Sequence, residues 1–304
     1  MGYLFVFVAL LCGVTKGYCG KKTSGTLVNT SDAMMVNTVR MLACIFVGLA
    51  IMLFQGELSS LSASPTFLAV ALLSGVSTAA FTVTWLLSVR QGAYIMVDVF
   101  LLIGVILPLL LCKFFYGESI APIQWIGIAL LVVAGYIICT YNVSIKGKMT
   151  LKGLVLLILC TVSCGLTDFS QKMFTRVLPE GNIAGFNMYT YLFAGLTLAV
   201  CCIGFRTVEK KKVTLQSPKK VILPIVGYIA VMAICLLLNS YFKTLAAHYL
   251  TAAQIYPLSQ GGSVVLSMAM SAVFFKEKIN LRCVIGVVLA FIALLLINVL
   301  PAYL

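Results

Sequence analysis

The sequence predicts an all-α integral membrane protein with ten transmembrane helices, arranged as two inverted five-helix repeats. The first observation behind this fold class is composition. The chain has 304 residues, of which 62% are hydrophobic and 10% charged, and its mean hydropathy is +1.12. A soluble domain cannot bury that much apolar surface, so we expect most of the chain to lie in a lipid bilayer.

The second observation is an internal repeat. The segment CGVTK at residues 12–16 recurs as CGLTD at residues 164–168, and a matching glutamate loop precedes the last apolar block of each half, at Glu118 and Glu277. If each half holds an odd number of spans, the second half sits inverted in the bilayer, which is typical of secondary transporters. We therefore predict two units, residues 1–145 and residues 146–304.

Charged and turn residues divide the chain into ten apolar blocks. Each block is close to the roughly 20 residues that a helix needs to cross a bilayer core. The first block has no basic start and no small-residue cleavage site, so we expect it to be a span rather than a signal peptide. The separators include, in chain order, Lys21 and Lys22, Gln55-Gly56-Glu57, Arg90, Glu118, Lys146 and Lys148, Arg176, Lys210 to Lys212, His248, and Lys276 to Lys278. The predicted spans run approximately over residues 2–20, 35–55, 66–88, 93–115, 122–141, 153–174, 186–205, 221–243, 251–275 and 281–301.

Several classes of function are disfavoured by what the sequence lacks. The connections are too short for a soluble catalytic or nucleotide-binding domain, and no phosphate-binding loop of the Walker A type is present. Most of the 11 cysteines lie in apolar blocks, where a free cysteine acts as a small hydrophobic residue, and no CxxC pair suggests zinc. We therefore expect no metal site, no cofactor and no enzymatic activity.

The net charge of +13 is better explained by membrane orientation than by nucleic-acid binding. Most of the 21 Lys and Arg residues fall in the odd-numbered connections between the predicted spans. Because positive loops favour the cytoplasm, this bias predicts that both termini lie outside.

Local motifs resemble the EamA-like family of the drug/metabolite transporter superfamily. They are FFYGE at residues 114–118 followed by QWIGIAL at 124–130, the second copy FFKE at 274–277 followed by IGV at 285–287, and TLAAHYLTAA at 244–253. The resemblance covers the whole chain and implies the ten-helix fold and a transport function, without naming a substrate. Similar proteins keep both termini in the cytoplasm, opposite to the charge bias. Small relatives carry a functional glutamate in the first helix, where this chain has Lys16 instead.

Three ionisable residues lie well inside apolar blocks: Lys16, Asp98 and Asp168. Each costs about 2.5–3.5 kcal/mol at a helix centre, so each is a candidate for function. Lys16 and Asp168 hold equivalent positions in the two repeats, and we expect them to line the central pathway. The alternatives are that Lys16 extends to the membrane interface, that Asp168 pairs with Lys172 one turn away, and that Asp98 caps first-turn amides.

The ninth span is predicted to contain a helix break at Pro257, Gly261 and Gly262, because proline removes a backbone hydrogen bond. Interrupted helices in repeat proteins often mark the substrate site. The alternative is close helix packing through the two glycines. The pathway candidates, with polar and aromatic neighbours included, are Lys16, Asp98, Asp168, Asn239, Tyr256, Gln260 and Trp85.

The function predicted from these features is secondary transport of a small organic metabolite by alternating access. An amino-acid-like zwitterion would suit a site with both a lysine and an aspartate, and proton coupling could run through Asp98 or Asp168. The alternatives are an intramembrane lipid-modifying enzyme and a channel. The expected partners are a small-molecule substrate and the lipid bilayer, not nucleic acid, and a homodimer is left open. The expected location is the plasma membrane, as a multi-pass protein, and specifically a bacterial inner membrane.

Overall fold

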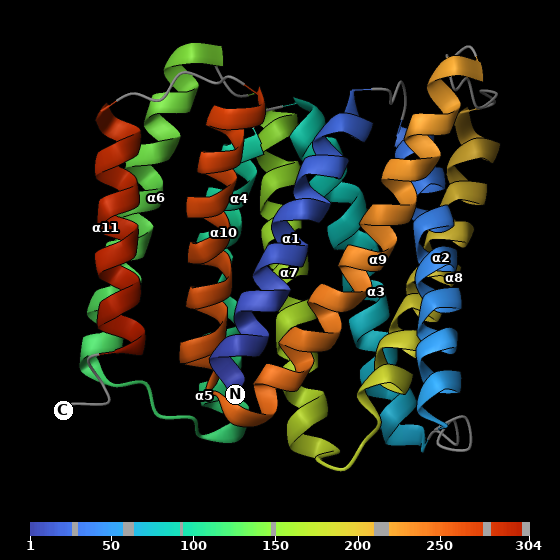
Figure 1. The fold of residues 1–304 in the computed structure, drawn as a ribbon, viewed down its shortest axis with the longest axis horizontal. Coiled ribbons are helices and arrows are strands. Elements are labelled where there is room, and N and C mark those ends of the chain that lie inside the picture. Colours follow the sequence, from blue (N-terminus) through green and yellow to red (C-terminus); the bar gives the residue numbers. More distant parts are fainter. Residues whose placement is uncertain are drawn as a thin grey trace.

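The computed structural model describes residues 1–25, 30–56, 64–91, 94–146, 150–209, 219–275 and 281–299. In these ranges the chain forms helices and no strands. Ten spans result, because α4 and α5 follow one another within a single span (Figure 1). The helices are α1 (Gly2–Ser24), α2 (Thr30–Gln55), α3 (Pro65–Gln91), α4 (Tyr94–Gly104), α5 (Ile106–Tyr116), α6 (Pro122–Lys146), α7 (Leu151–Val177), α8 (Ile183–Glu209), α9 (Lys219–Tyr249), α10 (Ala252–Phe275) and α11 (Leu281–Asn298).

The helices have the length and surface of membrane spans. Six of them, α1, α2, α3, α7, α8 and α9, are long and apolar enough to cross a bilayer. Shorter apolar stretches occur in the spans formed by α4 with α5, by α6 and by α11. Large apolar side chains such as Phe46, Phe54 and Val200 are exposed on the outside of the bundle, where lipid would cover them. The chain is therefore a multi-pass membrane protein.

The packing of the helices confirms the predicted pair of inverted five-helix repeats. Helices of the first half pack against helices of the second: α1 with α9, α3 with α7, α2 with α8, α4 with α10, and α6 with α11. Exchanging the two halves turns the α1–α9 contact into the α7–α3 contact and leaves the other pairs unchanged. Because α1 and α7 begin at opposite ends of the bundle (Figure 1), the halves are inverted. The unit boundary at residues 145 and 146 stays a prediction.

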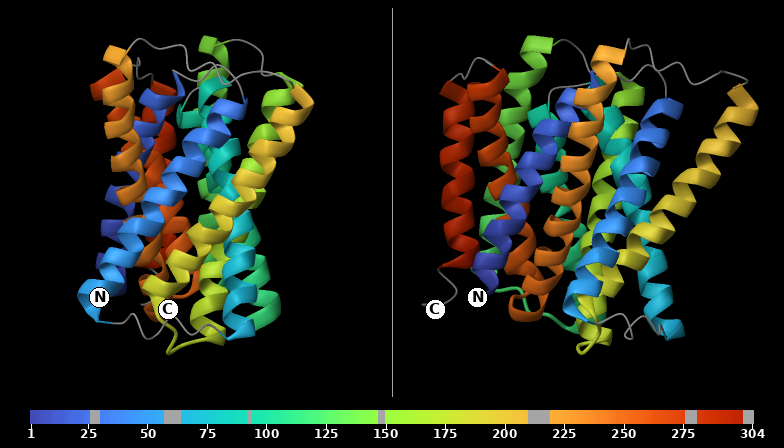
Figure 2. Two further views of the ribbon diagram at one scale, coloured as in Figure 1. Left: turned by 90° about the vertical axis from the view of Figure 1, so that its right-hand side faces the viewer. Right: turned by 45° about the vertical axis from the view of Figure 1, so that its right-hand side comes forward.

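The bundle is elongated in cross-section. The α6–α11 pair stands at one edge and the α2–α8 pair at the other, with the remaining helices between them (Figure 1). Figure 2 shows that α8 leans away from the rest of the bundle toward one end. The start of α1 and the end of α11 lie at the same end of the bundle (Figure 1), but the side of the membrane that this end faces stays a prediction.

The interruption lies in the fourth span, not in the ninth. Between α4 and α5 the helix is interrupted at Val105, just before Pro108. Pro108 has no N–H to donate to the carbonyl of Gly104, so one helical hydrogen bond is lost there. Gly104 packs closely on α7, since an added Cβ would lie 2.8 Å from Cγ2 of Thr161, and the Thr161 hydroxyl donates to the carbonyl of Phe100 at 3.2 Å.

The predicted helix break at Pro257, Gly261 and Gly262 is therefore wrong, because α10 runs as one helix through all three residues. Pro257 lies in the second turn, where the loss of one hydrogen bond does not end a helix that is packed on its neighbours. The two glycines allow close packing instead. A Cβ at Gly261 would lie 2.9 Å from Leu294 of α11, and one at Gly262 would collide with Leu10 of α1.

Candidate functional site

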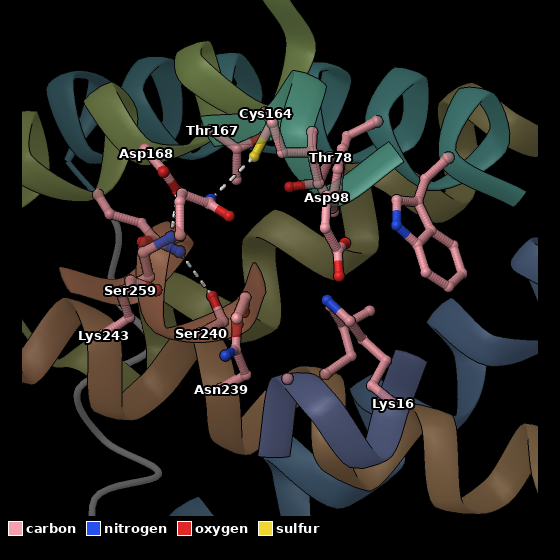
Figure 3. A pocket seen from close by; sticks show the side chains of 18 of the residues that line it. Lys16, Thr78, Asp98, Cys164, Thr167, Asp168, Asn239, Ser240, Lys243 and Ser259 are labelled. Carbon is pink, nitrogen blue, oxygen red and sulfur yellow. Dashed lines mark hydrogen bonds and ion pairs between the residues drawn. The ribbon is translucent and has the colours of Figure 1, made fainter. Parts of the chain in front are cut away.

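A polar cavity of about 80 Å³ lies in the middle of the bundle, lined by α1, α3, α4, α7, α8, α9 and α10 (Figure 3). One water needs roughly 10–15 Å³ of such space, so the cavity has room for several. Four lysine and aspartate side chains line it: Lys16, Asp98, Asp168 and Lys243. They come from four different helices and from both halves of the chain.

Asp168 of α7 and Lys243 of α9 form a direct ion pair. The Lys243 Nζ lies 2.6 Å from Oδ1 of Asp168, and both side chains are buried. Tyr256 of α10 supports the pair from one side. Its hydroxyl donates to the backbone carbonyl of Asp168 at 2.6 Å, and its ring centroid lies 5.6 Å from the Lys243 nitrogen. The two opposite charges thus neutralise each other.

The predicted alternative of a pair between Asp168 and Lys172 is wrong. Lys172 points to the end of the bundle, where its Nζ donates to the carbonyls of Ala247 and Leu250 at 2.8 and 2.7 Å. Lys243 was not predicted as a site residue, because the eighth span was expected to end at residue 243, whereas α9 continues to Tyr249. The apolar residues that follow Lys243 were the sequence signal for a longer helix.

Lys16 of α1 and Asp98 of α4 face each other across the cavity (Figure 3). No ion pair within 4.0 Å joins them in the part of the chain that the structure describes. Asp98 is hydrogen-bonded to Ser267, but its Oδ2 is buried without a partner. The Lys16 nitrogen lies 5.6 Å from the ring centroid of Phe81. A lysine and an aspartate thus line one polar cavity without an ion pair between them, where a ligand could reach both.

The remaining predicted candidates divide into two groups. Asn239, Gln260 and Trp85 line the same cavity as Lys16, Asp98 and Asp168. Tyr256 does not line it but holds the backbone of Asp168. Pro257, Gly261 and Gly262 also lie outside the lining, although their neighbours Ser259, Gln260 and Ser263 belong to it.

Two of the lining residues are fixed by their own contacts. The side-chain amide of Asn239 donates to the carbonyl of Ala9 in α1, and that of Gln260 donates to the Cys164 sulfur at 3.4 Å. An added Cβ at Gly13 would lie 3.1 Å from the Asn239 amide nitrogen, so a glycine there lets α1 approach α9 closely. The cavity wall is thus held by one contact between the halves, from Asn239 to Ala9, and by one within the second half, from Gln260 to Cys164.

A chain of hydrogen bonds continues the polar region beyond the cavity. The Gln171 amide donates to the Ser240 hydroxyl at 2.9 Å, which in turn donates to Oδ1 of Asn187 at 2.6 Å. Gln171 was missed from the sequence. So was Arg40, which lies inside α2 and is 1% exposed.

A second group of charges lies at the end of the bundle where α1 begins. It consists of Glu118, Lys172, Arg176 and the first backbone amide of α10, at Ala252, and we call it the Glu118 cluster. The Glu118 Oε1 lies 2.7 Å from Nη2 of Arg176 and 3.4 Å from Nζ of Lys172, while Oε2 accepts from the Ala252 N–H at 2.9 Å. Glu118 thus caps the N-terminus of α10. Its counterpart Glu277 lies outside the described residues.

The pKa of Glu118 is held below its usual value. Burial raises this pKa, but the hydrogen bonds from Arg176 and from the Ala252 amide, together with the positive charge of Lys172, lower it by more. The carboxylate is therefore ionised and fully paired within the protein.

His248 does not support the lipid-modifying enzyme. It is exposed near the end of α9 and does not line the cavity. Among the described residues no group of three His, Cys, Asp or Glu side chains could hold a metal ion.

Comparison with known proteins agrees with this architecture. Residues 151–299 match the EamA-like transporter family. A crystal structure, described only as that of a protein, superposes with a TM-score of 0.77 over 99% of this chain and 98% of its own. Its sequence is 14% identical, so the likeness shows a common fold alone. No curated protein sequence matches the chain.

Proposed function

Because residues 151–299 match the EamA-like transporter family, we propose that the chain is a secondary transporter, which moves a small organic metabolite by alternating access. The inverted halves support this mechanism, since two equivalent packings of one pair of repeats can open a central site to either side in turn. The cavity lies between the halves, where such a motion would change its access.

The observation that carries the substrate class is the placement of Lys16 and Asp98. They face each other across the cavity without contact, whereas Asp168 and Lys243 already neutralise each other (Figure 3). A zwitterion such as an amino acid would place its carboxylate at Lys16 and its ammonium group at Asp98. Both contacts would be charge-assisted hydrogen bonds, which are stronger than neutral ones.

The Glu118 cluster supports a closed state at one end. Glu118 belongs to the first half of the chain, and its partners Lys172, Arg176 and Ala252 belong to the second half. Their contacts therefore join the two halves at the end of the bundle where α1 begins. These contacts would have to break for the cavity to open at that end. The cluster therefore acts as a gate in the proposed cycle.

Proton coupling would run through Asp98 rather than Asp168. Asp168 has a lysine at 2.6 Å, while Asp98 has a buried oxygen with no partner. A carboxyl group without a cation is free to exchange a proton between the two access states.

The test is electrical recording from proteoliposomes on a solid-supported membrane. Amino-acid and pH jumps are applied to the wild type, Asp98→Asn and Asp168→Asn. We expect wild-type currents with amino acids, a loss of pH dependence in Asp98→Asn, and reduced transport in Asp168→Asn. If both variants transport with the pH dependence of the wild type, the coupling is wrong. If the wild type takes up no amino acid, in either currents or radiolabel exchange, the substrate class is wrong.

A further inference from the structure

One wall of the central cavity carries polar groups that the proposed contacts to Lys16 and Asp98 leave unused. It belongs to α10, from which Ser259, Gln260 and Ser263 line the cavity, and we call these three residues the α10 wall. The side chains of Ser259 and Gln260 are buried, at 6% and 8% exposed. A buried polar group costs free energy unless it has a hydrogen-bond partner, so the partners of this wall bear on what the cavity holds.

The hydroxyl groups of the α10 wall have no hydrogen-bond partner in the part of the protein that the structure describes. Neither Ser259 nor Ser263 donates to a backbone carbonyl or to another side chain there. Hydroxyls inside membrane helices commonly donate to the carbonyl four residues before them. Those of Thr15, Ser77 and Thr244 do so in this protein, at 2.9, 2.7 and 2.8 Å. The two serines of the α10 wall depart from this pattern, so their hydroxyl groups are left for the cavity.

Side-chain amides add hydrogen-bond acceptors to the same cavity. The Gln260 nitrogen donates to the Cys164 sulfur at 3.4 Å, and within the described ranges the Gln260 oxygen has no partner. The Gln171 nitrogen donates to the Ser240 hydroxyl at 2.9 Å, and the Gln171 oxygen is buried without a partner. This amide has a fixed orientation, because the Ser240 hydroxyl gives its one proton to Asn187 and can only accept from Gln171. Hydroxyl donors and amide oxygens thus line one cavity together.

The α10 wall lies between the two acidic residues of the cavity. Toward the start of α10, the Tyr256 hydroxyl donates to the backbone carbonyl of Asp168 at 2.6 Å. Further along the helix, Ser267 is hydrogen-bonded to Asp98. Ser263 precedes Ser267 by one turn, which is about 6 Å along the helix axis. A side chain that extends from an ammonium group at Asp98 therefore reaches the α10 wall within about one helical turn.

We propose that the α10 wall is a side-chain subsite, and that the preferred substrate is a zwitterion whose side chain ends in a carboxamide. This inference rests on the proposed function, because it names the side chain of the transported zwitterion. A carboxamide offers N–H donors to the Gln260 oxygen and a carbonyl acceptor to the hydroxyls of Ser259 and Ser263. A carboxylate has no N–H to offer, and Lys243, which lines the same cavity, is already paired with Asp168 (Figure 3). An apolar side chain leaves all of these polar groups unpaired, which is the basis of strong discrimination.

The experiment compares three amino acids of similar length. Thermal unfolding of the purified full chain in detergent is measured with L-glutamine, L-glutamate and L-leucine, at equal ionic strength. The proteins are the wild type, the double variant with Ser259→Ala and Ser263→Ala, and Ser77→Ala. Ser77 is the matched control, because it is a buried serine outside the cavity lining whose hydroxyl is bonded within its own helix. Dissociation constants follow from the concentration dependence of the Tm.

We expect glutamine to stabilise the wild type at lower concentration than glutamate or leucine does. The double variant should weaken glutamine binding by about tenfold, the size of one to two hydrogen bonds, and should leave leucine binding unchanged. Ser77→Ala should keep the wild-type dissociation constants for all three amino acids. A merely structural role of the two serines would instead change the Tm of the protein without ligand and leave the preference for glutamine as it is.

Two results would overturn the subsite. One is that glutamine stabilises the wild type no more than glutamate or leucine does. The other is that the double variant folds and keeps the wild-type preference for glutamine. If the double variant does not fold, the comparison of the three amino acids on the wild type decides. Equal binding and equal uptake of all three would refute the subsite alone, whereas glutamine binding without uptake by proteoliposomes would refute the transport proposal alone.

Discussion

The Glu118 cluster and the central cavity contain similar side chains in different states. Each brings acidic and basic side chains from the two halves of the chain together. In the Glu118 cluster both carboxylate oxygens have partners within the protein. In the cavity, Asp98 keeps an unpartnered oxygen and faces Lys16 without contact. Complete pairing indicates a structural contact, and incomplete pairing indicates a place for a ligand.

Position along the helices explains the difference. The Glu118 cluster lies at helix ends, where backbone amides and carbonyls have no partner within their own helix. Glu118 takes the first amide of α10, and Lys172 takes the last carbonyls of α9. The cavity lies in the middle of the spans, where backbone groups are already bonded. Charges there depend on other side chains, water or a ligand.

The largest expected effect on stability comes from the Glu118 cluster, where both carboxylate oxygens have partners. Glu118→Gln removes the acid that compensates Lys172, whose side chain is 3% exposed. Leaving a buried charge unpaired costs about 3–5 kcal/mol, so we expect a clear drop in the Tm of the detergent-solubilised protein. Glu180→Gln, at an exposed position in the α7–α8 connection, is the control and should stay within about 0.5 kcal/mol of the wild type. Equal Tm values for the two variants would remove the contrast between the regions.

The next largest effect is expected at the Asp168–Lys243 ion pair, which lines the cavity but is already paired within the protein. Lys243→Met leaves Asp168 without its cation and should lower stability by up to about 3 kcal/mol, less than a dry site would, because cavity water shares the charge. The double variant with Asp168→Asn removes both charges and should recover part of the loss. A thermal double-mutant cycle measures the coupling. If the losses simply add, the ion pair does not contribute to stability.

Acid should act on the Glu118 cluster before it acts on the wider fold. The pKa of Glu118 is lowered in the folded protein, so its stabilising contribution is fully present above its unfolded pKa, near 4.3, and is lost as the pH falls through the lower folded pKa. We expect the Tm difference between the wild type and Glu118→Gln to be constant from pH 7 to about pH 5 and to shrink at more acidic pH. A difference that persists down to pH 3 would contradict this assignment.

The smallest expected effect on stability is in the cavity. Asp98→Asn keeps the size of the side chain and removes the charge of a carboxylate that has one unpartnered oxygen. The free energy of unfolding should therefore fall by less than about 1 kcal/mol, or rise, as measured from the Tm. Transport should nevertheless lose its dependence on pH. Ser267→Ala, which removes only the hydrogen bond to Asp98, is the matched control and should retain transport. A large loss of stability in Asp98→Asn would make this residue structural.

Part of the site was predictable from the sequence, because rare polar residues in long apolar blocks stand out. Lys16, Asp98 and Asp168 were found in this way, and the cavity brings all three together. Lys243 and Arg40 were missed because they lie near the ends of apolar blocks, where a charged residue is normally read as part of a loop. Only the true lengths of α9 and α2 show that both are buried.

The sequence by itself determined the fold class and the inverted repeat, because hydropathy and spacing are local properties that the bilayer converts directly into spans. It could not decide which charges pair. Asp168 has Lys172 one turn away on its own helix, yet it pairs with Lys243 of α9, while Lys172 joins Glu118. Only the tertiary structure decided this, since the partner of a buried charge depends on which helices pack together and at what height. The same holds for the interruption of the fourth span, which lies close to Pro108, whereas α10 is continuous through Pro257.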